Sequence, residues 1–312
     1  MDIPPRSVAA GVGGMVLVGG SVSVSHTLTT APLFVAQAIR YLIAALLLLA
    51  MARMARAPIV RPRGREWLWL GGVAATGLVL FNIAVVRGVA HAEPAVIAVA
   101  VAGVPILLGV IGPLLERRRP TRAVLVAAVV VTAGSVLAEG TGRTDAIGVA
   151  WAGVALLCEG GFTLLAVPVL RRHGAWGVSV HSVWLGAAMF AVLGAFEGPS
   201  AALRLTGAQW AAIGYLAVLV TAFAFVLWYS AVAVLGAGRA GLLTGIAPIS
   251  AAVTGVVLGR GTPGPTVWLG LLVVIGGLAG GLLGWPQLRR LRRLVSLRRL
   301  RRARPVPVGE CG

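Results

Sequence analysis

The chain is poor in charged residues, in cysteine and in aromatic residues, and it contains no lysine. Only 12% of its 312 residues are charged, whereas 58% are hydrophobic and the mean hydropathy is +0.95. A soluble domain carries about 25% charged residues, and surface-to-volume scaling leaves too much of this apolar surface outside any core. The composition therefore excludes a soluble globular protein and predicts an all-α integral membrane protein.

Other absences exclude whole classes of function. The two cysteines, Cys158 and Cys311, are too few and too badly placed for a disulfide framework. No phosphate-binding loop of the GxxxxGK[ST] kind is present, and no soluble domain is available to hold a nucleotide. We therefore expect no cofactor, no metal and no activity driven by nucleotide hydrolysis.

Long apolar runs predict ten membrane-spanning helices, because about 20 apolar residues are needed to cross the hydrocarbon layer. The first run follows Arg6 and ends in small residues, so a cleaved signal peptide is an alternative, but its length favours a transmembrane helix. The predicted spans are 8–27, 32–52, 67–88, 94–115, 122–139, 148–170, 175–196, 208–235, 240–259 and 265–285.

The arginines indicate how these spans are oriented. If the N-terminus is cytoplasmic, 22 of the 27 arginines fall in cytoplasmic links or in the tail. Short cytoplasmic loops collect positive charge because its translocation is costly. We therefore predict a multi-pass protein of the cell membrane with both termini in the cytoplasm, which requires an even number of spans.

Two phrases of the sequence indicate an internal duplication. PILLGVIGPLLERRRP at 105–120 returns 143 residues later as PISAAVTGVVLGRGTP at 248–263, with most of its charge removed. Each half has five spans, so the second half enters the membrane upside down, and the positive-inside rule explains the lost charges. The sequence predicts two inverted repeats at 8–139 and 148–285, followed by a basic cytoplasmic tail at 286–312. Such repeats are typical of secondary transporters that bind substrate near the midplane.

The segments 19–49 and 215–251 resemble the EamA group of drug/metabolite transporters. In the first segment a Gly-Ser helix is followed by Pro32 and by Arg40 next to an aromatic residue, and the segments around Pro105 and Pro248 resemble the family's fourth and ninth helices. The resemblance covers about 8–284 and implies ten helices in two five-helix units around a central cavity. It also implies export or exchange of small metabolites, amino acids or drugs.

One departure from the family pattern concerns the end of the ninth helix. The family usually ends this helix in Leu-Gly-Glu, but here Arg260 follows Leu258 and Gly259. The second half therefore cannot do what that glutamate does, whereas Glu116 remains in the first half.

Glu159 is the first candidate for a transport site. It is predicted to lie in the middle of the span 148–170, about 11 residues from either end, beside Gly160 and Gly161. Ionisable groups within the hydrocarbon layer are costly and are functional candidates by default. The functional interpretation is a site for a proton or a cationic substrate, and the alternative is a neutral or paired glutamate that ties two helices together.

Other polar, aromatic and proline residues within the spans are weaker candidates. A lone polar residue in a span is more often an interhelical hydrogen bond than a ligand contact, and we expect structural roles for Arg40, Gln37 and His181. For Arg40 the alternative is attraction of an anionic group. The substrate or proton pathway candidates are His26, Asn82, Thr221, Trp228 and Tyr229, with core packing as the alternative for the two aromatic residues; Pro105 and Pro248 are predicted to break helices at the cavity.

The basic segment 288–304 has no aromatic residue on which bases could stack. We therefore expect it to contact anionic lipid and not nucleic acid. A small-molecule substrate is the main expected partner, and a second copy of the chain is a further candidate. The tail otherwise serves to set the topology.

Three classes of function compete. The first is a secondary transporter, with coupling from an ion gradient or from exchange. The second is a membrane sensor or scaffold that does not transport. The third is an intramembrane enzyme, for which Glu159 with His181 is the one pair worth naming, but no catalytic motif accompanies it. We expect a transporter and no enzymatic activity.

Overall fold

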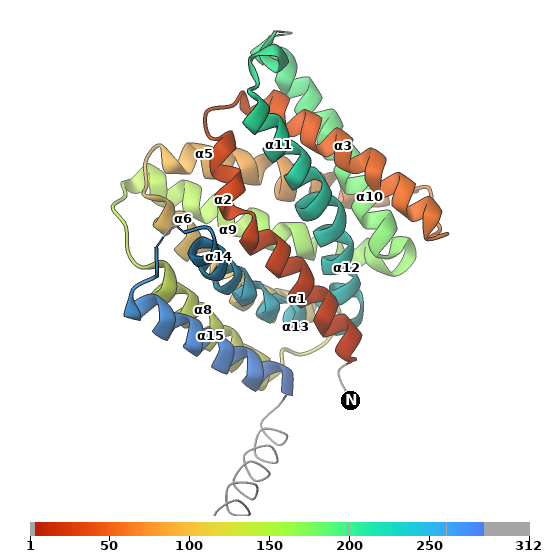
Figure 1. Cartoon of the computed structure of the whole chain (residues 1–312). Coiled ribbons are helices and arrows are strands. Elements are labelled where there is room, and N and C mark those ends of the chain that lie inside the picture. Colours follow the sequence, from red (N-terminus) through yellow and green to blue (C-terminus); the bar gives the residue numbers. More distant parts are fainter. Residues whose placement is uncertain (1–3, 199, 260, 284–312) are drawn as a thin grey trace, which may run out of the picture.

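The computed structural model describes residues 4–198, 200–259 and 261–283, and the predicted basic tail lies outside these residues. The described residues form helices and no strand, apart from an isolated bridge between Ala92 and Thr144. The helices are α1 (Pro5–Gly20), α2 (Val22–Ser25), α3 (Leu33–Met54), α4 (Glu66–Val73), α5 (Phe81–Val89), α6 (Pro94–Val101), α7 (Val104–Leu115), α8 (Arg122–Glu139), α9 (Ala146–Leu164), α10 (Val167–Gly194), α11 (Gly207–Tyr215), α12 (Ala224–Leu235), α13 (Ala237–Leu242), α14 (Ile246–Val257) and α15 (Pro265–Leu283) (Figure 1).

Several of these helices join end to end into single spans. A π-helical segment, Ala74–Leu80, joins α4 to α5, and a second one, Leu216–Phe223, joins α11 to α12. Within the described part of the chain, nine segments are long and apolar enough to cross a membrane. The first predicted span corresponds to α1, which is about 24 Å long, and to α2, which follows after Ser21. The chain is thus a multi-pass membrane protein.

The sixth span ends earlier than the sequence predicts. Helix α9 stops at Leu164, and Val167 already begins α10, so 165–170 do not belong to the sixth span. Pro168 lies in the first turn of α10, where proline fits a helix start. Gly174 then interrupts α10 with a φ of 62°, a conformation that glycine adopts without steric cost. The ninth span also begins earlier, at Ala237, because the link before it is the single residue Gly236.

The two halves repeat each other element by element with the offset of 143 residues. Shifted by this number, α8 falls on 265–282, where α15 lies, and the start of α6 falls on Ala237, where α13 begins. The π-helical segment of the first half falls on 217–223, within the π-helical segment of the second half. The chain therefore consists of two five-helix repeats in inverted orientation, as the sequence predicts.

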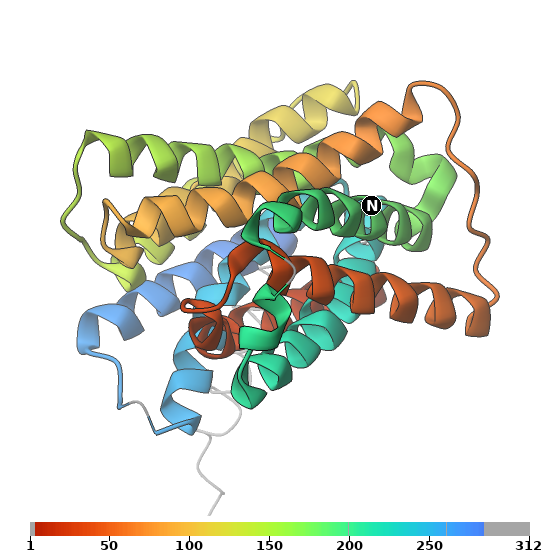
Figure 2. The same cartoon turned by 90° about the horizontal axis from the view of Figure 1, so that it is seen from above.

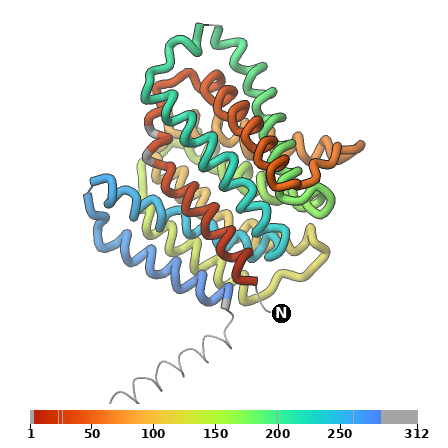
Figure 3. The backbone as a smooth tube through the Cα atoms, turned by 45° about the vertical axis from the view of Figure 1, so that its right-hand side comes forward, coloured from red at the N-terminus to blue at the C-terminus, as the bar shows by residue number. Residues whose placement is uncertain are grey.

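The last helices of the two repeats, α8 and α15, pack closely side by side (Figures 1 and 3). A methyl group on Gly134 would lie 2.7 Å from the backbone nitrogen of Val274, and one on Gly277 would lie 3.0 Å from that of Val131. The two contacts exchange when 143 is added to one residue and subtracted from the other. A pseudo-two-fold axis therefore passes between these helices, and their close approach requires small residues.

The second helices of the repeats, α3 and α10, also lie side by side, as the perpendicular views show (Figures 1 and 2). Tyr41 on α3 stacks on Phe190 of α10 at a ring-centroid distance of 5.6 Å. Both side chains are buried, so this contact belongs to the main core. The packing brings the inner face of α3 against the π-helical segment of α11–α12, where the polar residues of the spans gather.

Candidate functional site

A buried chain of hydrogen bonds joins three spans of the protein. The Arg40 Nε atom donates to Thr221 Oγ1 at 3.1 Å, and its NH1 group donates to Gln37 Oε1 at 3.3 Å. Gln37 Nε2 donates to Asn82 Oδ1 at 3.0 Å, and Asn82 Nδ2 donates to Tyr41 Oη at 3.3 Å and to the Leu78 carbonyl. The structure thus brings two pathway candidates, Asn82 and Thr221, together with two residues expected to be structural, Arg40 and Gln37.

Both π-helical segments contribute to this network. Leu78, whose carbonyl orients Asn82, lies in Ala74–Leu80, and Thr221 lies in Leu216–Phe223. A π-helical turn shifts the register of a helix by one residue, and such turns are frequent at functional sites. The turns therefore help to aim side chains of the third span of each repeat at Arg40.

Glu159 lies on α9, half-buried, five residues before the helix ends at Leu164. The prediction that it is equally distant from both ends of its span is wrong, because the span is shorter than the apolar run. Its carboxylate has no hydrogen bond or ion pair with another residue in the described ranges, and it lies within electrostatic range of the Tyr229 phenol. Gly160 and Gly161 allow Leu107 and Thr76 to approach the backbone beside it.

Trp228 and Tyr229 tie α12 to α9. Both side chains are buried, with exposures of 4% and 0%. Trp228 Nε1 donates to Thr163 Oγ1 at 3.0 Å, and the Tyr229 hydroxyl donates to the Phe162 carbonyl at 2.9 Å. In this conformation the rings are therefore core residues whose polar atoms have partners, and neither is free to stack on a substrate.

The two histidine candidates differ in what the structure describes. His26 lies in a 3₁₀ turn, His26–Leu28, and its side chain is outside the described part. His181 on α10 makes a hydrogen bond through Nε2 to the Val60 carbonyl at 2.9 Å and accepts one from Trp184 at Nδ1. These bonds fix a neutral ring with the proton on Nε2, and they attach the link 55–65 to α10.

The prolines lie beside breaks in the fourth and ninth spans. Pro105 is in the first turn of α7, just after α6 ends at Val101, and Pro248 is in the first turn of α14, just after the 3₁₀ turn Leu243–Gly245. Discontinuous helices at matching positions of two repeats are typical of transporters. Each span can therefore move as two half-helices.

The two ends of the bundle are packed differently. We call the end that carries the links 55–65 and 116–121 the basic end. There α7 packs on α13, and a methyl group on Gly112 would lie 2.8 Å from the Ala237 side chain. At the opposite end the equivalent helices, α14 and α6, have no comparable contact, and a methyl group on Gly255 would meet no described atom within 4 Å.

A carboxylate strengthens the contact at the basic end. Glu116 follows the last residue of α7, and its Oε1 atom accepts a hydrogen bond of 2.9 Å from the backbone N–H of Ala237, the first residue of α13. The opposite end cannot form this bond. The residue with matching backbone angles after α14 is Leu258, and the counterpart of Ala237 is Pro94, which has no N–H.

The sequence names Glu116 but gives no reason to place it in the site. Its partner is a backbone N–H 121 residues away, which no side-chain pattern shows. The available signal was the pair of differences between the repeats, glutamate against leucine and alanine against proline. These differences become meaningful only when α7 and α13 are seen to touch.

Charged contacts tie together the loops at the opposite end. The Glu93 carboxylate accepts from Arg143 Nε at 2.9 Å, and this guanidinium lowers the pKa of Glu93. Asp145 Oδ1 accepts from the Gly148 N–H at the start of α9, and Oδ2 is 3.0 Å from His91 Nδ1. The Gly148 amide and then His91 hold the pKa of Asp145 below its ordinary value.

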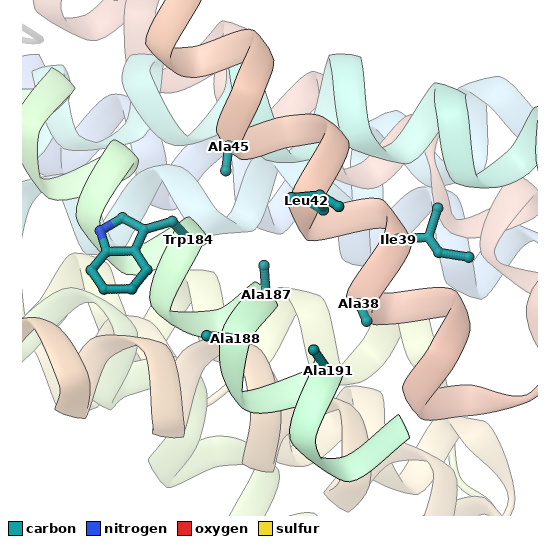
Figure 4. A pocket seen from close by; sticks show the side chains of 8 residues that line it. All are labelled: Ala38, Ile39, Leu42, Ala45, Trp184, Ala187, Ala188 and Ala191. Carbon is teal, nitrogen blue, oxygen red and sulfur yellow. The ribbon is translucent and has the colours of Figure 1, made fainter. Parts of the chain in front are cut away.

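Two surface grooves lie away from the polar network. One, of about 370 Å³, lies between α3 and α10, with small side chains of the two helices facing each other beside Trp184 (Figure 4). Its apolar lining at the depth of a span suits hydrocarbon and not a polar substrate. The other, of about 520 Å³, lies at the opposite end, where Glu197 accepts hydrogen bonds from the Phe34 and Val35 amides and so caps α3.

The fold, with its paired five-helix repeats and broken fourth and ninth spans, defines a membrane transporter. Residues 7–139 and 146–282 each match the EamA-like transporter family, and the chain belongs to this family. It is 28% identical over 275 residues to a Bacillus subtilis (strain 168) protein named the uncharacterized transporter YetK, covering 85% of this chain and 83% of that one. A crystal structure with 19% identity superposes with a TM-score of 0.75 over 89% of this chain and 97% of that chain, which shows the shared fold.

Proposed function

We propose that the protein is a secondary active transporter that exports or exchanges small metabolites, amino acids or drugs across the cell membrane. The observation that carries this proposal is the difference between the two ends of a duplicated structure. The same helices that meet at the basic end as α7 and α13 are apart at the opposite end as α14 and α6. A repeat that can form this contact at either end, one end at a time, has the two states that alternating access requires.

The charge distribution supports an orientation for these states. Arginines concentrate at the basic end and in the tail, so this end faces the cytoplasm. The conformation described is therefore closed to the cytoplasm and open to the outside. Reporter fusions after Arg65 and Arg119 should be cytoplasmic, and fusions near Arg143 and Gly198 should be external. The reverse pattern would overturn the orientation.

Glu159 is our candidate for coupling transport to a proton or cation gradient. Helix α9 packs on the third and fourth spans of the first repeat, including α7, which forms the closed contact. Cys158 and Tyr229 are the titratable neighbours within electrostatic range of Glu159 in the described part. A carboxylate without a protein partner in this position can take up a proton in one state and release it in the other.

Untargeted profiling of extracellular metabolites tests the proposed function. Cells that overexpress the protein and cells that lack it should differ in a small set of metabolites. Glu159→Gln keeps the shape of the side chain but cannot titrate, so it should insert normally and lose pH-driven transport while it retains exchange. Cys158→Ser, next to it, is the matched control. A Glu159→Gln protein that transports at the wild-type rate from pH 5.5 to 8 would make Glu159 structural.

A further inference from the structure

The hydrogen-bond network around Arg40 has more donors than acceptors. A guanidinium carries five N–H groups, and Arg40 uses two of them, on Thr221 and Gln37. The other three have no acceptor in the described ranges. The Tyr41 hydroxyl accepts from Asn82, and its own proton likewise has no acceptor among the described residues. Donors of this kind, held in place by neighbours, are matched by a group that only accepts.

Arg40 is also a buried charge without a counterion. The residue is 9% exposed, and both of its hydrogen-bond acceptors are neutral. All four ion pairs of the described residues lie at helix ends or in loops and involve other residues. The desolvation of an unpaired charge is costly, so such a charge is stable when water or an anion reaches it.

Glu159 cannot be the missing counterion. Arg40 is bonded to Thr221, whereas Glu159 lies near Tyr229, eight residues further along the same span. At 1.5 Å per residue these two positions are about 12 Å apart along the helix. This separation is too large for an ion pair, and it is also too large for the amino and carboxyl groups of one α-amino acid.

The second repeat shows that the fold does not need this network. The positions equivalent to Arg40, Gln37 and Asn82 are occupied by Val183, Val180 and Phe225. The valines are buried, and the second and third spans of that repeat pack through apolar contacts. If polar bonds were required to hold these spans together, both repeats would need them. The network is therefore specific to one half, as a binding site is.

We propose that Arg40 binds the carboxylate of the transported molecule, with the Tyr41 hydroxyl as a second donor. This inference rests on the proposed function, because it names the class of substrate. A carboxylate carries one negative charge and two acceptor oxygens, so it neutralises one guanidinium in a bidentate pair. A phosphate, with nearly two charges, would leave an excess of charge in a poorly solvated place.

Binding to the purified full-length protein in nanodiscs tests the proposal without any transport step. The probes are pairs of nearly isosteric molecules that differ in charge: benzoate and benzamide, phenylacetate and phenylacetamide, L-leucine and L-leucinamide. A molecule that binds the folded state raises the thermal unfolding midpoint. We expect the carboxylates to raise the midpoint of the wild type and the amides to leave it unchanged.

Variants of Arg40 then locate the site. Arg40→Gln should weaken carboxylate binding by about 30-fold or more, because a buried charge pair loses one partner. Arg40→Lys keeps the charge but loses the planar fork, so it should bind with intermediate affinity, and it also serves if the Gln variant does not fold. Arg87→Gln, at the exposed end of α5, is the control and should bind as the wild type does.

Several outcomes overturn the proposal. They are equal midpoint shifts from carboxylates and amides, no shift from any carboxylate, and full carboxylate binding by Arg40→Gln. Carboxylate binding that depends on Arg40 in a protein that moves no metabolite would instead refute the transport function and leave the anion site standing.

Discussion

Removal of the Glu116 carboxylate should open the basic end of the protein. Glu116 holds the first N–H of α13 against the end of α7, and no equivalent bond can form at the opposite end. The bond therefore stabilises only the state that is closed at the basic end. Breaking it shifts the equilibrium toward the other state by its own free energy and leaves that state unchanged.

The size of the shift follows from the kind of bond. A hydrogen bond to a charged group contributes about 1.5–3 kcal/mol and a neutral one about 0.5–1.5 kcal/mol. Glu116 is half-buried, so values near the lower limits apply. Glu116→Gln keeps an acceptor oxygen and should cost about 1 kcal/mol, or about fivefold in the equilibrium. Glu116→Ala loses the bond and should shift it by about tenfold or more.

A buried cysteine reports the rare open state. Leu108 on α7 is fully buried and faces Gly241 of α13. After Cys158 and Cys311 are replaced by alanine, Leu108→Cys supplies a thiol that reacts with a soluble maleimide only when α7 and α13 separate. Its labelling rate in nanodiscs is then proportional to the open population and should rise about fivefold with Glu116→Gln.

Controls separate this effect from general loosening. Glu139→Gln removes a carboxylate at the opposite end that has no hydrogen bond in the described part, and it should leave the labelling rate unchanged. Labelling after denaturation should be complete in every variant. If both Glu116 variants label Leu108→Cys at the parent rate, the bond does not hold the basic end closed and the reasoning is refuted.

Three further predictions follow from packing, from charge and from the tail. Gly134→Leu should lower the unfolding midpoint strongly, because its side chain would meet the backbone of α15, whereas Gly276→Leu, which faces no described atom within 4 Å, should not; equal midpoints would refute the close approach of α8 and α15. The Asp145 carboxylate has a lowered pKa in the folded state, so the midpoint advantage of wild type over Asp145→Ala should be full above its unfolded pKa of about 3.9 and disappear as pH falls through the folded value. An advantage that grows toward low pH would contradict this sign. Deletion of 289–312 should spare insertion and most transport but weaken retention on vesicles with anionic lipid, and complete loss of transport in a well-expressed truncation would place the tail in the mechanism.

Much of the fold could be predicted from the sequence because a membrane restricts what a chain can do. Span length and apolar composition predict 122–139, and the helix found is Arg122–Glu139. The phrase repeated after 143 residues predicts the offset that the helix bounds then follow. The sixth span was predicted too long because the apolar run continues without a polar break to Leu170. Its end depends on Pro168 and Gly174, whose effect is conformational and not compositional.

The candidate site was predicted residue by residue but not as an arrangement. Arg40, Gln37, Asn82 and Thr221 stand out because polar groups are costly within a span. Their assembly into one network depends on contacts between residues up to 181 positions apart and on π-helical turns that no periodicity in the sequence shows.

The sequence by itself determined that this protein spans the membrane many times, that it is duplicated and that its halves are inverted, because hydropathy, the repeated phrase and the placement of arginines are linear properties of the chain. The tertiary structure alone decided which end is closed. Both repeats carry helices able to make the same contact, and the difference lies in whether α7 meets α13 or α14 meets α6. Glu116 opposite Ala237, against Leu258 opposite Pro94, gives the physical reason why one closure is stronger.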